Sequence, residues 1–589
     1  MERAIILCAF IGAVVGVTTN YTTYYGTNLT SAESAQYVAN NTAANCTIAV
    51  ETCNSTERRR IDGTCNNLNH PPAGAARTPY LRLLPAEYFL KSGSEWEPRL
   101  GKDNSSLVAM RVARTSMWAE GRISDENLTS CVAHMSVYYV TDITNTQDTT
   151  NYVSWRPNCC SAAGKNEYAC APNSVPSTDY VHRFSGITCL NMTRPLTYQT
   201  SGCIPNTTVP LRIVDATPTQ DLSPIYGNTI ETGRRTYQDG QLTVDEVNDR
   251  TFPPTSGIRL LLGVNFVGII YHWRWHNHIA TELQKVNPCW DDETLFNTAR
   301  EINIAAGQQI FFYELFSLLL GKKNLTNDGV YSSSPPKSYY NSSLSPAISL
   351  EYPYILRWLH TLQDGELRLY FNNGTLAEIY PIVNLTANVN YLKQGSNMDR
   401  VSQGCFRQPA GNSKDRIVDP DVCTVVLDFD FIQCGLGLVK HHKSTTTWLS
   451  RYFSFQVIEI LKQLYKDVKD IDLLVGTWGE RVMKGAYVPP TVYCIAKEQM
   501  IRTRASDRFW FENKDRPYAF TTNQLAQIKN VTMARMLCDV GGGVTDIQPK
   551  AFLLPSKTNA IVSCDNITNI DYNAWGDTSC FLQTDTITT

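Results

Sequence analysis

Residues 127–144 read NLTSCVAHMSVYYVTDIT, and this stretch decides how the rest of the chain is interpreted. Its apolar residues recur at helical spacing, which predicts a helix with one buried face, formed by Val132, Met135, Tyr139 and Ile143. The many β-branched residues leave a buried strand as the alternative. A buried aspartate such as Asp142 needs a cation or several hydrogen-bond donors. The residues just before Asp142 therefore bear on whether the protein is an enzyme.

The composition is that of a globular protein. The chain has 589 residues, of which 43% are apolar and 18% charged, and its formal net charge is −3. This length allows roughly two to four average domains or one large one. The small net charge and the absence of a long basic block argue against nucleic acid as a partner.

Three features predict a secreted, extracellular protein. Residues 1–17 read as a signal peptide, with Arg3 before an apolar run too short to span a membrane. The alternative is a buried N-terminal strand or helix. The second feature is a set of fifteen N-x-S/T sequons, which predicts heavy N-glycosylation at Asn20, Asn28, Asn40, Asn45, Asn54, Asn104, Asn127, Asn191, Asn206, Asn324, Asn341, Asn373, Asn384, Asn530 and Asn566.

The third feature is the cysteine content. Eighteen cysteines, or seventeen after loss of Cys8 with the signal peptide, predict a disulfide framework with one thiol free or paired between chains. Residues 18–57 are rich in Thr and Asn and read as a glycosylated, partly irregular lead-in. The alternative for that segment is a packed subdomain held by Cys46 and Cys53.

From residue 58 onward the chain resembles the animal haem peroxidase family. The similar segments occur in the family's order: RRRIDGTCNNLNHPPAGAARTPYLRLLPAEY at 58–88, CAPNSVPSTDYVHRFSGITCLNMTR at 170–194, HNHIATELQKVNPCWDDETLFNTAREI at 276–302, SDRFWFEN at 506–513 and MLCDVGGGVTDIQPKAF at 536–552. The resemblance implies that residues 58–589 form a single, mainly α-helical domain with few short strands, stabilised by disulfides. It implies disulfides at Cys170, Cys189, Cys538 and Cys564, with Cys538–Cys564 as one pair.

The apolar patterns support a helical fold independently. Residues 292–319 show helical periodicity after an Asn-Pro start, and residues 454–468 show it again. Residues 259–275 are apolar nearly all round, which predicts a core helix. This run is too short and too interrupted to span a membrane.

The resemblance also implies a calcium site. In the family, calcium is held by an aspartate on the distal helix and by a loop reading roughly T-x-[FY]-x-D-x-S. This chain offers Asp142 and TPTQDLS, which places Thr217, Thr219, Asp221 and Ser223 at the ligand positions. Calcium takes six to eight hard oxygen ligands, and these residue types supply them. The alternative is a polar surface loop with a solvated aspartate.

The proximal haem motif is partly kept. ILRWLHTL at 355–362 is similar to the family's F-R-x-G-H-T-L, which puts His360 at the iron ligand and Arg357 near a haem propionate. The alternative is that His360 is an ordinary core histidine. Phe431 falls where the family has an asparagine that orients this imidazole, a loss that would weaken the site.

The distal motif is largely lost. Against the family's W-G-Q-F-x-D-H-D the chain reads MSVYYVTD, so Val137 replaces the glutamine, Val140 the ester-forming aspartate and Thr141 the catalytic histidine. A threonine cannot act as the acid and base that peroxide cleavage needs. Ile258 and Leu261 fall at the positions of the catalytic arginine and the second ester-forming glutamate, with Arg259 one residue away.

Two other histidine groups are candidate metal sites. His272 and His276 are one helical turn apart in YHWRWHNH, which also contains His278, and no glutamate completes a zinc protease motif. His441 and His442 read as a solvated loop.

Three hypotheses follow. The favoured one is a secreted, calcium-binding pseudo-peroxidase with a structural, adhesive or matrix role, whose partners are extracellular proteins, matrix or a second copy of the chain. The second is a haem-binding protein that uses His360 and has weak peroxidase activity, or carries haem. The third is an active cross-linking peroxidase that recruits other distal groups, such as Arg259 and His134.

Overall fold

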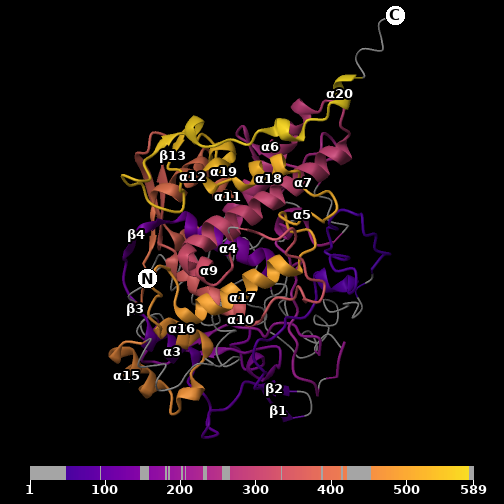
Figure 1. Cartoon of the computed structure of the whole chain (residues 1–589). Helices are drawn as coiled ribbons and strands as arrows, with labels where there is room; N and C mark the ends of the chain where they lie inside the picture. Colours follow the sequence, from indigo (N-terminus) through magenta and orange to yellow (C-terminus); the bar gives the residue numbers. More distant parts are fainter. Residues whose placement is uncertain are drawn as a thin grey trace, which may run out of the picture.

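The stretch at residues 127–144 forms a short strand followed by a helix. Strand β4 spans Ser124–Thr129 and helix α4 spans Cys131–Thr144. The helix prediction is confirmed, and the strand alternative is wrong for α4. Side chains are buried on nearly all sides of α4, not on one face only, because the helix runs through the middle of the core (Figure 1).

The structure is a computed structural model that describes residues 48, 50–92, 95–145, 158–179, 182, 186–199, 203–205, 207–229, 235–254, 265–332, 334–385, 389–412, 416–420 and 453–582. Several predictions fall outside the described residues: the signal peptide at 1–17, most of the 18–57 segment, Cys46, Ile258, Arg259, Leu261, Phe431, His441, His442, Asn20, Asn28, Asn40, Asn45 and Asn206.

Helices are the main regular secondary structure of the described residues. Those of eight residues or more, besides α4, are α3 (Met110–Met117), α6 (Asn265–Val286), α7 (Asp292–Gln309), α12 (Asn397–Arg407), α15 (Phe455–Leu464), α17 (Pro490–Ser506), α18 (Thr522–Lys529) and α19 (Met533–Val540). The shorter ones are α5 (Ser223–Tyr226), α8 (Phe316–Leu320), α9 (Lys322–Asn327), α10 (Glu351–Leu356), α11 (Val389–Leu392), α16 (Leu473–Gly479) and α20 (Ser579–Leu582). A π-helical segment, η4 (Ile310–Leu315), joins α7 to α8, and a 3-10 helix, η5 (Arg357–Leu362), follows α10.

The described strands are short and pair only two by two. The antiparallel pairs are β1 (Phe89–Ser92) with β2 (Glu95–Glu97), β4 with β11 (Pro409–Gly411), β5 (Asn173–Ser174) with β6 (Cys189–Leu190), β7 (Asp245–Val247) with β8 (Arg250–Phe252), β9 (Glu366–Tyr370) with β10 (Leu376–Pro381), and β13 (Asp546–Ile547) with β14 (Val562–Ser563). Strands β3 (Ala119–Glu120) and β12 (Ile417–Val418) pair in parallel. The mainly α-helical class with few short strands is confirmed.

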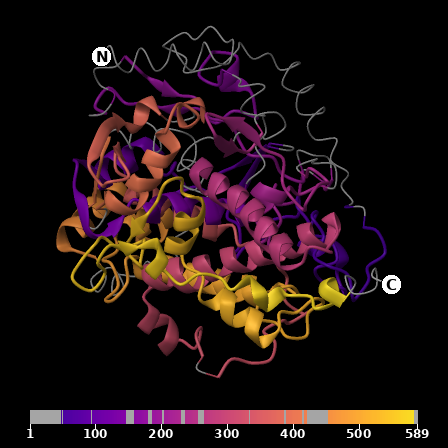
Figure 2. The same ribbon diagram turned by 90° about the horizontal axis from the view of Figure 1, so that it is seen from above.

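The predicted helices at 292–319 and 454–468 are confirmed as α7 with its continuation and as α15. The predicted core helix at 259–275 is described from Asn265 and continues to Val286. Helix α6 packs against both α4 and α7; the three lie close together in Figure 1, and the magenta to pink helices that include α6 and α7 lie in the middle of the view in Figure 2. Gly268 lets α6 pass close to α4, because a Cβ atom on Gly268 would lie 2.5 Å from Cγ of Tyr138.

Five disulfides are described: Cys53–Cys65, Cys159–Cys170, Cys160–Cys189, Cys289–Cys580 and Cys538–Cys564. The Cys538–Cys564 pair is confirmed, and Cys170 and Cys189 are bridged to two adjacent cysteines. Cys53 bonds to Cys65, which excludes a Cys46–Cys53 bridge, and Cys46 lies outside the described residues. The prediction of a single free thiol is also wrong, because three described cysteines carry no disulfide: Cys131, Cys405 and Cys494.

Within the described ranges, no helix combines the length and the apolar character that crossing a membrane requires.

Candidate functional site

The carboxylate of Asp142 accepts hydrogen bonds from the loop at residues 217–223. The backbone N–H groups of Leu222 and Ser223 donate to it, at 3.1 Å to Oδ2 and 2.8 Å to Oδ1. The side-chain amide of Gln220 donates to Oδ2 as well. Asp142 is fully buried near the end of α4, so the loop supplies the donors that a buried carboxylate needs.

The other predicted residues converge on Asp221. The hydroxyls of Thr217 and Thr219 donate to its two carboxylate oxygens at 2.6 and 3.0 Å. All three residues are at most 2% exposed. The loop turns sharply at Leu222, whose φ of 59° and ψ of 41° lie in the left-handed region that costs free energy for a residue other than glycine. This turn presents the N–H groups of Leu222 and Ser223 to Asp142.

The two aspartates form a buried acidic pair. Burial and the negative charge of Asp221 raise the pKa of Asp142 well above its usual range. Burial also raises the pKa of Asp221, an effect that the positive charge of Arg59 opposes. Two buried carboxylates with nearby threonine and serine hydroxyls are hard oxygen donors of the kind that calcium binds. These residues could hold a divalent cation.

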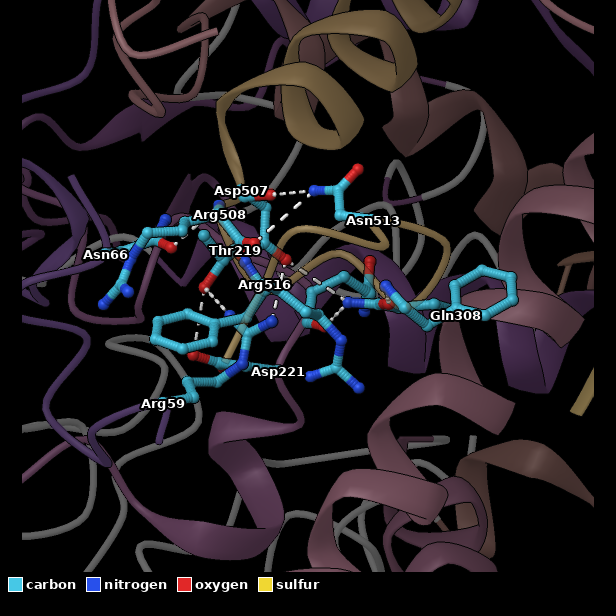
Figure 3. Close-up of polar contacts among 12 residues, drawn as sticks. Arg59, Asn66, Thr219, Asp221, Gln308, Asp507, Arg508, Asn513 and Arg516 are labelled. Carbon is cyan, nitrogen blue, oxygen red and sulfur yellow. Dashed lines mark hydrogen bonds and ion pairs between the residues drawn. The ribbon is translucent and has the colours of Figure 1, made fainter. Parts of the chain in front are cut away.

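A buried ion pair lies beside this loop (Figure 3). The guanidinium of Arg59 donates to Asp507 at 2.8 Å and to the Thr219 hydroxyl at 3.3 Å. Gln308 donates to the same Asp507 oxygen at 3.4 Å and to the backbone oxygen of Gln220 at 2.9 Å. The network joins the segment after residue 58, the loop at residues 217–223, α7 and the segment after α17. Gln220 and Arg59 were not predicted as site residues, although they lie within the motifs at 217–223 and 58–88.

The distal positions carry no acid or base. The hydroxyl of Thr141 donates to the backbone oxygens of Val137 and Tyr138, at 2.9 and 2.8 Å, so it is engaged within its own helix. Val137 and Val140 are aliphatic side chains at the other two positions. The segment that would bring Arg259 near lies outside the described residues.

His134 is the nearest described histidine along α4. It is 7% exposed, and its Nδ1 has no hydrogen-bond partner among the described residues. Burial lowers the pKa of His134 to about 4. Seven residues separate it from Thr141, which is about 10 Å along a helix axis at 1.5 Å per residue. That offset is too large for His134 to act at the position of Thr141.

The predicted proximal histidine lies on a segment that packs on α4. His360 is half-buried on η5, and its neighbours Trp358 and Leu359 belong to the same apolar core as Tyr138. Cα atoms of α4 and η5 approach within 8 Å of each other. Helices in direct contact have axes about 8–10 Å apart, and a planar group such as a haem ring between two segments would increase that separation. The approach of α4 and η5 is that of segments in direct contact. The side chain of Arg357 is not among those described.

The rival histidines are used elsewhere. His272 and His276 are fully buried on α6 and hydrogen-bond through both ring nitrogens to protein groups. His278 Nε2 lies 3.9 Å from Asp539. In the described part of the chain, the one cluster with metal-ligand spacing is Cys53, Glu57 and Cys65, and its two cysteines form a disulfide.

The predicted glycosylation sites differ in exposure. The exposed asparagines are Asn54, Asn104, Asn127, Asn341, Asn373, Asn384, Asn530 and Asn566, and Asn324 is half-buried. Asn191 is buried, and its side-chain oxygen accepts the backbone N–H of Cys159 at 2.8 Å. A glycan on Asn191 is incompatible with this packing, so the prediction for that sequon is corrected.

The family model that matches the chain is described as "Animal haem peroxidase", and it matches residues 58–440 and 432–552. The chain belongs to the animal haem peroxidase family. The match spans the Asp142 loop site and His360, so the departures at Val137, Val140 and Thr141 lie inside the family domain.

Similar proteins agree with membership of this family, and a solved structure shares the fold. A peroxidase from Drosophila melanogaster is 29% identical, with 92% of this chain and 86% of that protein covered. A chorion peroxidase from the same species is 25% identical over 88% of this chain and 70% of that protein. Peroxidase A from Dictyostelium discoideum has the same fold, with a TM-score of 0.67 at 20% identity, covering 85% of this chain and all of that one.

Proposed function

We propose that this protein is a secreted, N-glycosylated pseudo-peroxidase, which keeps the family fold, binds calcium and has a structural, adhesive or matrix role. The single observation that carries the proposal is the state of Thr141. At the position of the catalytic histidine stands a hydroxyl that donates to the backbone of its own helix. Loss of a positioned acid and base alone costs roughly a hundred- to ten-thousandfold in rate.

The distal helix supports the proposal through its packing as well. Aliphatic Val137 and Val140 replace polar groups, and α4 lies directly against the segment that carries His360. These features suit a helix that stabilises the core. A protein that retains the fold without the chemistry would present its surface, rather than a reactive centre, to extracellular partners or to a second copy of itself.

Calcium is the ion that the loop site fits best. Asp142, Thr217, Asp221 and Ser223 would supply carboxylate and hydroxyl oxygens, and Thr219 would supply its backbone oxygen. The cation would offset the charge of the two buried carboxylates and hold α4 to the loop. Its role would be structural.

Export is supported by the five described disulfides and by the exposed sequons. Disulfides persist in oxidising compartments and are rare in the cytosol. Glycans would be carried by the exposed asparagines of the folded protein.

A second candidate is a haem-binding protein, and the observation that favours it is His360. This imidazole lies half-buried on η5, next to the central helix. His360 would be the axial ligand, and a bound haem would supply redox chemistry at its iron. Thr141 would contribute no proton transfer, because a threonine hydroxyl cannot take up a proton from peroxide and return it.

Absorbance separates the two candidates. The full chain, secreted from eukaryotic cells and purified, is titrated with hemin, and the Soret band is compared with that of a His360→Ala variant. The pseudo-peroxidase proposal predicts spectra that match free hemin in both proteins. A stoichiometric, red-shifted Soret band that His360→Ala abolishes would favour the haem-binding candidate instead.

A further inference from the structure

A chain of hydrogen bonds runs through the core from the distal helix to a surface turn. It links Tyr139 on α4, His272 on α6, Asn303 on α7, Tyr226 on α5 and His276 on α6. Its contacts are Tyr139 Oη to His272 Nε2 at 3.0 Å, His272 Nδ1 to Asn303 Oδ1 at 2.8 Å, Asn303 Nδ2 to Tyr226 Oη at 2.9 Å and Tyr226 Oη to His276 Nδ1 at 2.9 Å. All five residues are at most 3% exposed.

The direction of every bond in this chain is determined. His276 Nε2 lies 2.9 Å from the Gly240 carbonyl, which can only accept, so Nε2 carries the proton. Burial lowers the pKa of His276 to about 4, so the ring is neutral at pH 7 and its Nδ1 accepts from Tyr226. The phenol oxygen of Tyr226 accepts in turn from the Asn303 amide.

The same reasoning fixes the other half of the chain. The Asn303 amide nitrogen also donates to the His272 carbonyl at 3.0 Å, so its oxygen must face His272 Nδ1. That nitrogen of His272 therefore carries the proton. Burial lowers the pKa of His272 to about 4, which leaves Nε2 as a neutral acceptor. Tyr139 donates its phenolic hydrogen to this nitrogen.

Neighbouring tyrosines lack this arrangement. Tyr138 is equally buried and stacks on His272 with 5.3 Å between ring centroids, but its hydroxyl has no hydrogen-bond partner among the described residues. Tyr226 has an imidazole acceptor, yet the guanidinium of Arg300 lies 5.3 Å from its ring centroid. A nearby cation opposes removal of an electron from that ring. Tyr139 combines burial and an imidazole acceptor without a cation over its ring among the described contacts.

We propose that Tyr139 is a redox-active tyrosine and that His272 is its proton acceptor. A one-electron, outer-sphere oxidant takes one electron from Tyr139. The phenolic O–H bond breaks and the proton moves to His272 Nε2, which gives a neutral phenoxyl radical and an imidazolium. The imidazolium keeps its Nδ1–H on Asn303 and donates its new N–H back to the phenoxyl oxygen. Reduction returns the proton.

Burial explains why an internal base is required. A phenol loses its proton when an electron is removed, and a fully buried phenol cannot release that proton to water. Oxidation of Tyr138 would leave a positive charge in the core, whereas oxidation of Tyr139 places that charge on an imidazole held by Asn303. The inference does not depend on haem and goes beyond the proposed function.

Electron paramagnetic resonance tests this assignment. The full chain is mixed with hexachloroiridate(IV), treated briefly with ascorbate to reduce radicals on exposed tyrosines such as Tyr237 and Tyr518, and frozen. The expected result is a tyrosyl signal that survives ascorbate, falls at least tenfold in Tyr139→Phe and is retained in Tyr138→Phe.

A second variant keeps the proposal falsifiable if Tyr139→Phe does not fold. In His272→Gln, Tyr139 keeps a hydrogen-bond acceptor but loses its base. The tyrosyl signal that survives ascorbate should therefore again fall at least tenfold. Any remaining signal should form without a solvent deuterium isotope effect. A purely structural network predicts no difference between His272→Gln and the unmodified chain. That result, an undiminished signal in Tyr139→Phe, or no protected signal in the unmodified chain, would overturn the assignment.

Discussion

Asp142 and Ser223 are joined at both the side chain and the backbone. The N–H of Ser223 donates to Asp142 Oδ1 at 2.8 Å, and the Ser223 hydroxyl lies 3.2 Å from the Asp142 backbone oxygen. The contact connects the end of α4 to the start of α5, 81 positions later in the chain. Because both residues are buried, the central helix and the loop at 217–223 form one structural unit.

We predict that calcium stabilises the protein through this unit. After treatment with a chelator, addition of calcium should raise the melting temperature. At a free calcium concentration one hundred times Kd, the free energy of unfolding should increase by about 2.7 kcal/mol. Asp142→Asn removes one of the two carboxylates and should abolish the rise. The measurement is differential scanning calorimetry with and without calcium, with magnesium as the ion control.

Asp179→Asn is the matched control for that experiment. Asp179 is also buried, but it pairs with Arg111 at 2.5 Å, away from the loop. This variant should be less stable and still respond to calcium. If calcium does not change the melting temperature of the unmodified chain, the prediction of a calcium site is wrong.

The ion pair of Arg59 and Asp507 should contribute strongly to stability. Both side chains are at most 2% exposed and lie 2.8 Å apart. Asp507→Asn leaves the buried Arg59 charge without its ion-pair partner, which costs roughly 3–5 kcal/mol. Urea unfolding followed by tryptophan fluorescence measures this loss.

An exposed pair supplies the comparison. Lys337 and Asp515 lie 2.5 Å apart with 71% and 55% of their side chains exposed. Asp515→Asn should change the free energy of unfolding by about 1 kcal/mol or less. Equal effects of the two substitutions would show that the Arg59 network does not hold the fold.

Local patterns predicted much of this architecture. The periodicity of residues 131–144 depends on neighbours along the chain, and so does the every-other-residue spacing of Thr217, Thr219 and Asp221. The contact between Arg59 and Asp507 spans 448 positions and has no local signature. Gln220 has no local signature either, because its amide gains its role only when α4 packs beside the loop and brings Asp142 within hydrogen-bond distance.

The disulfide connectivity shows the same limit. Spacing alone does not assign partners, because Cys159 and Cys160 are adjacent and pair with Cys170 and Cys189 respectively. Peptide mapping without reduction should recover these two bridges. Recovery of a Cys170–Cys189 peptide instead would contradict the described packing of this segment.

Glu314 should make stability depend on pH. It accepts the backbone N–H of Met533 at 2.9 Å at the start of α19, and burial raises the pKa of Glu314 from 4.5 to about 7. The folded state therefore binds more protons than the unfolded state between those values. The contribution of protonated Glu314 to the free energy of unfolding is fully present below pH 4.5. As the pH rises to 7, the free energy of unfolding falls by about 3 kcal/mol.

Glu314→Gln tests this dependence. The variant cannot ionise, so the difference in melting temperature between it and the unmodified chain should grow from pH 4.5 to 7 in favour of the variant. A difference that is constant across this range would show that Glu314 keeps its ordinary pKa.

The most direct test of the central claim is peroxide turnover. The purified chain is incubated with hemin and assayed, without removal of unbound hemin, for hydrogen-peroxide-dependent oxidation of guaiacol beside the same concentration of hemin alone. With Thr141 in place of the acid and base, we predict a rate no higher than that of hemin alone. A haem-loaded protein that oxidises guaiacol at least a hundredfold faster than hemin would contradict the pseudo-peroxidase assignment.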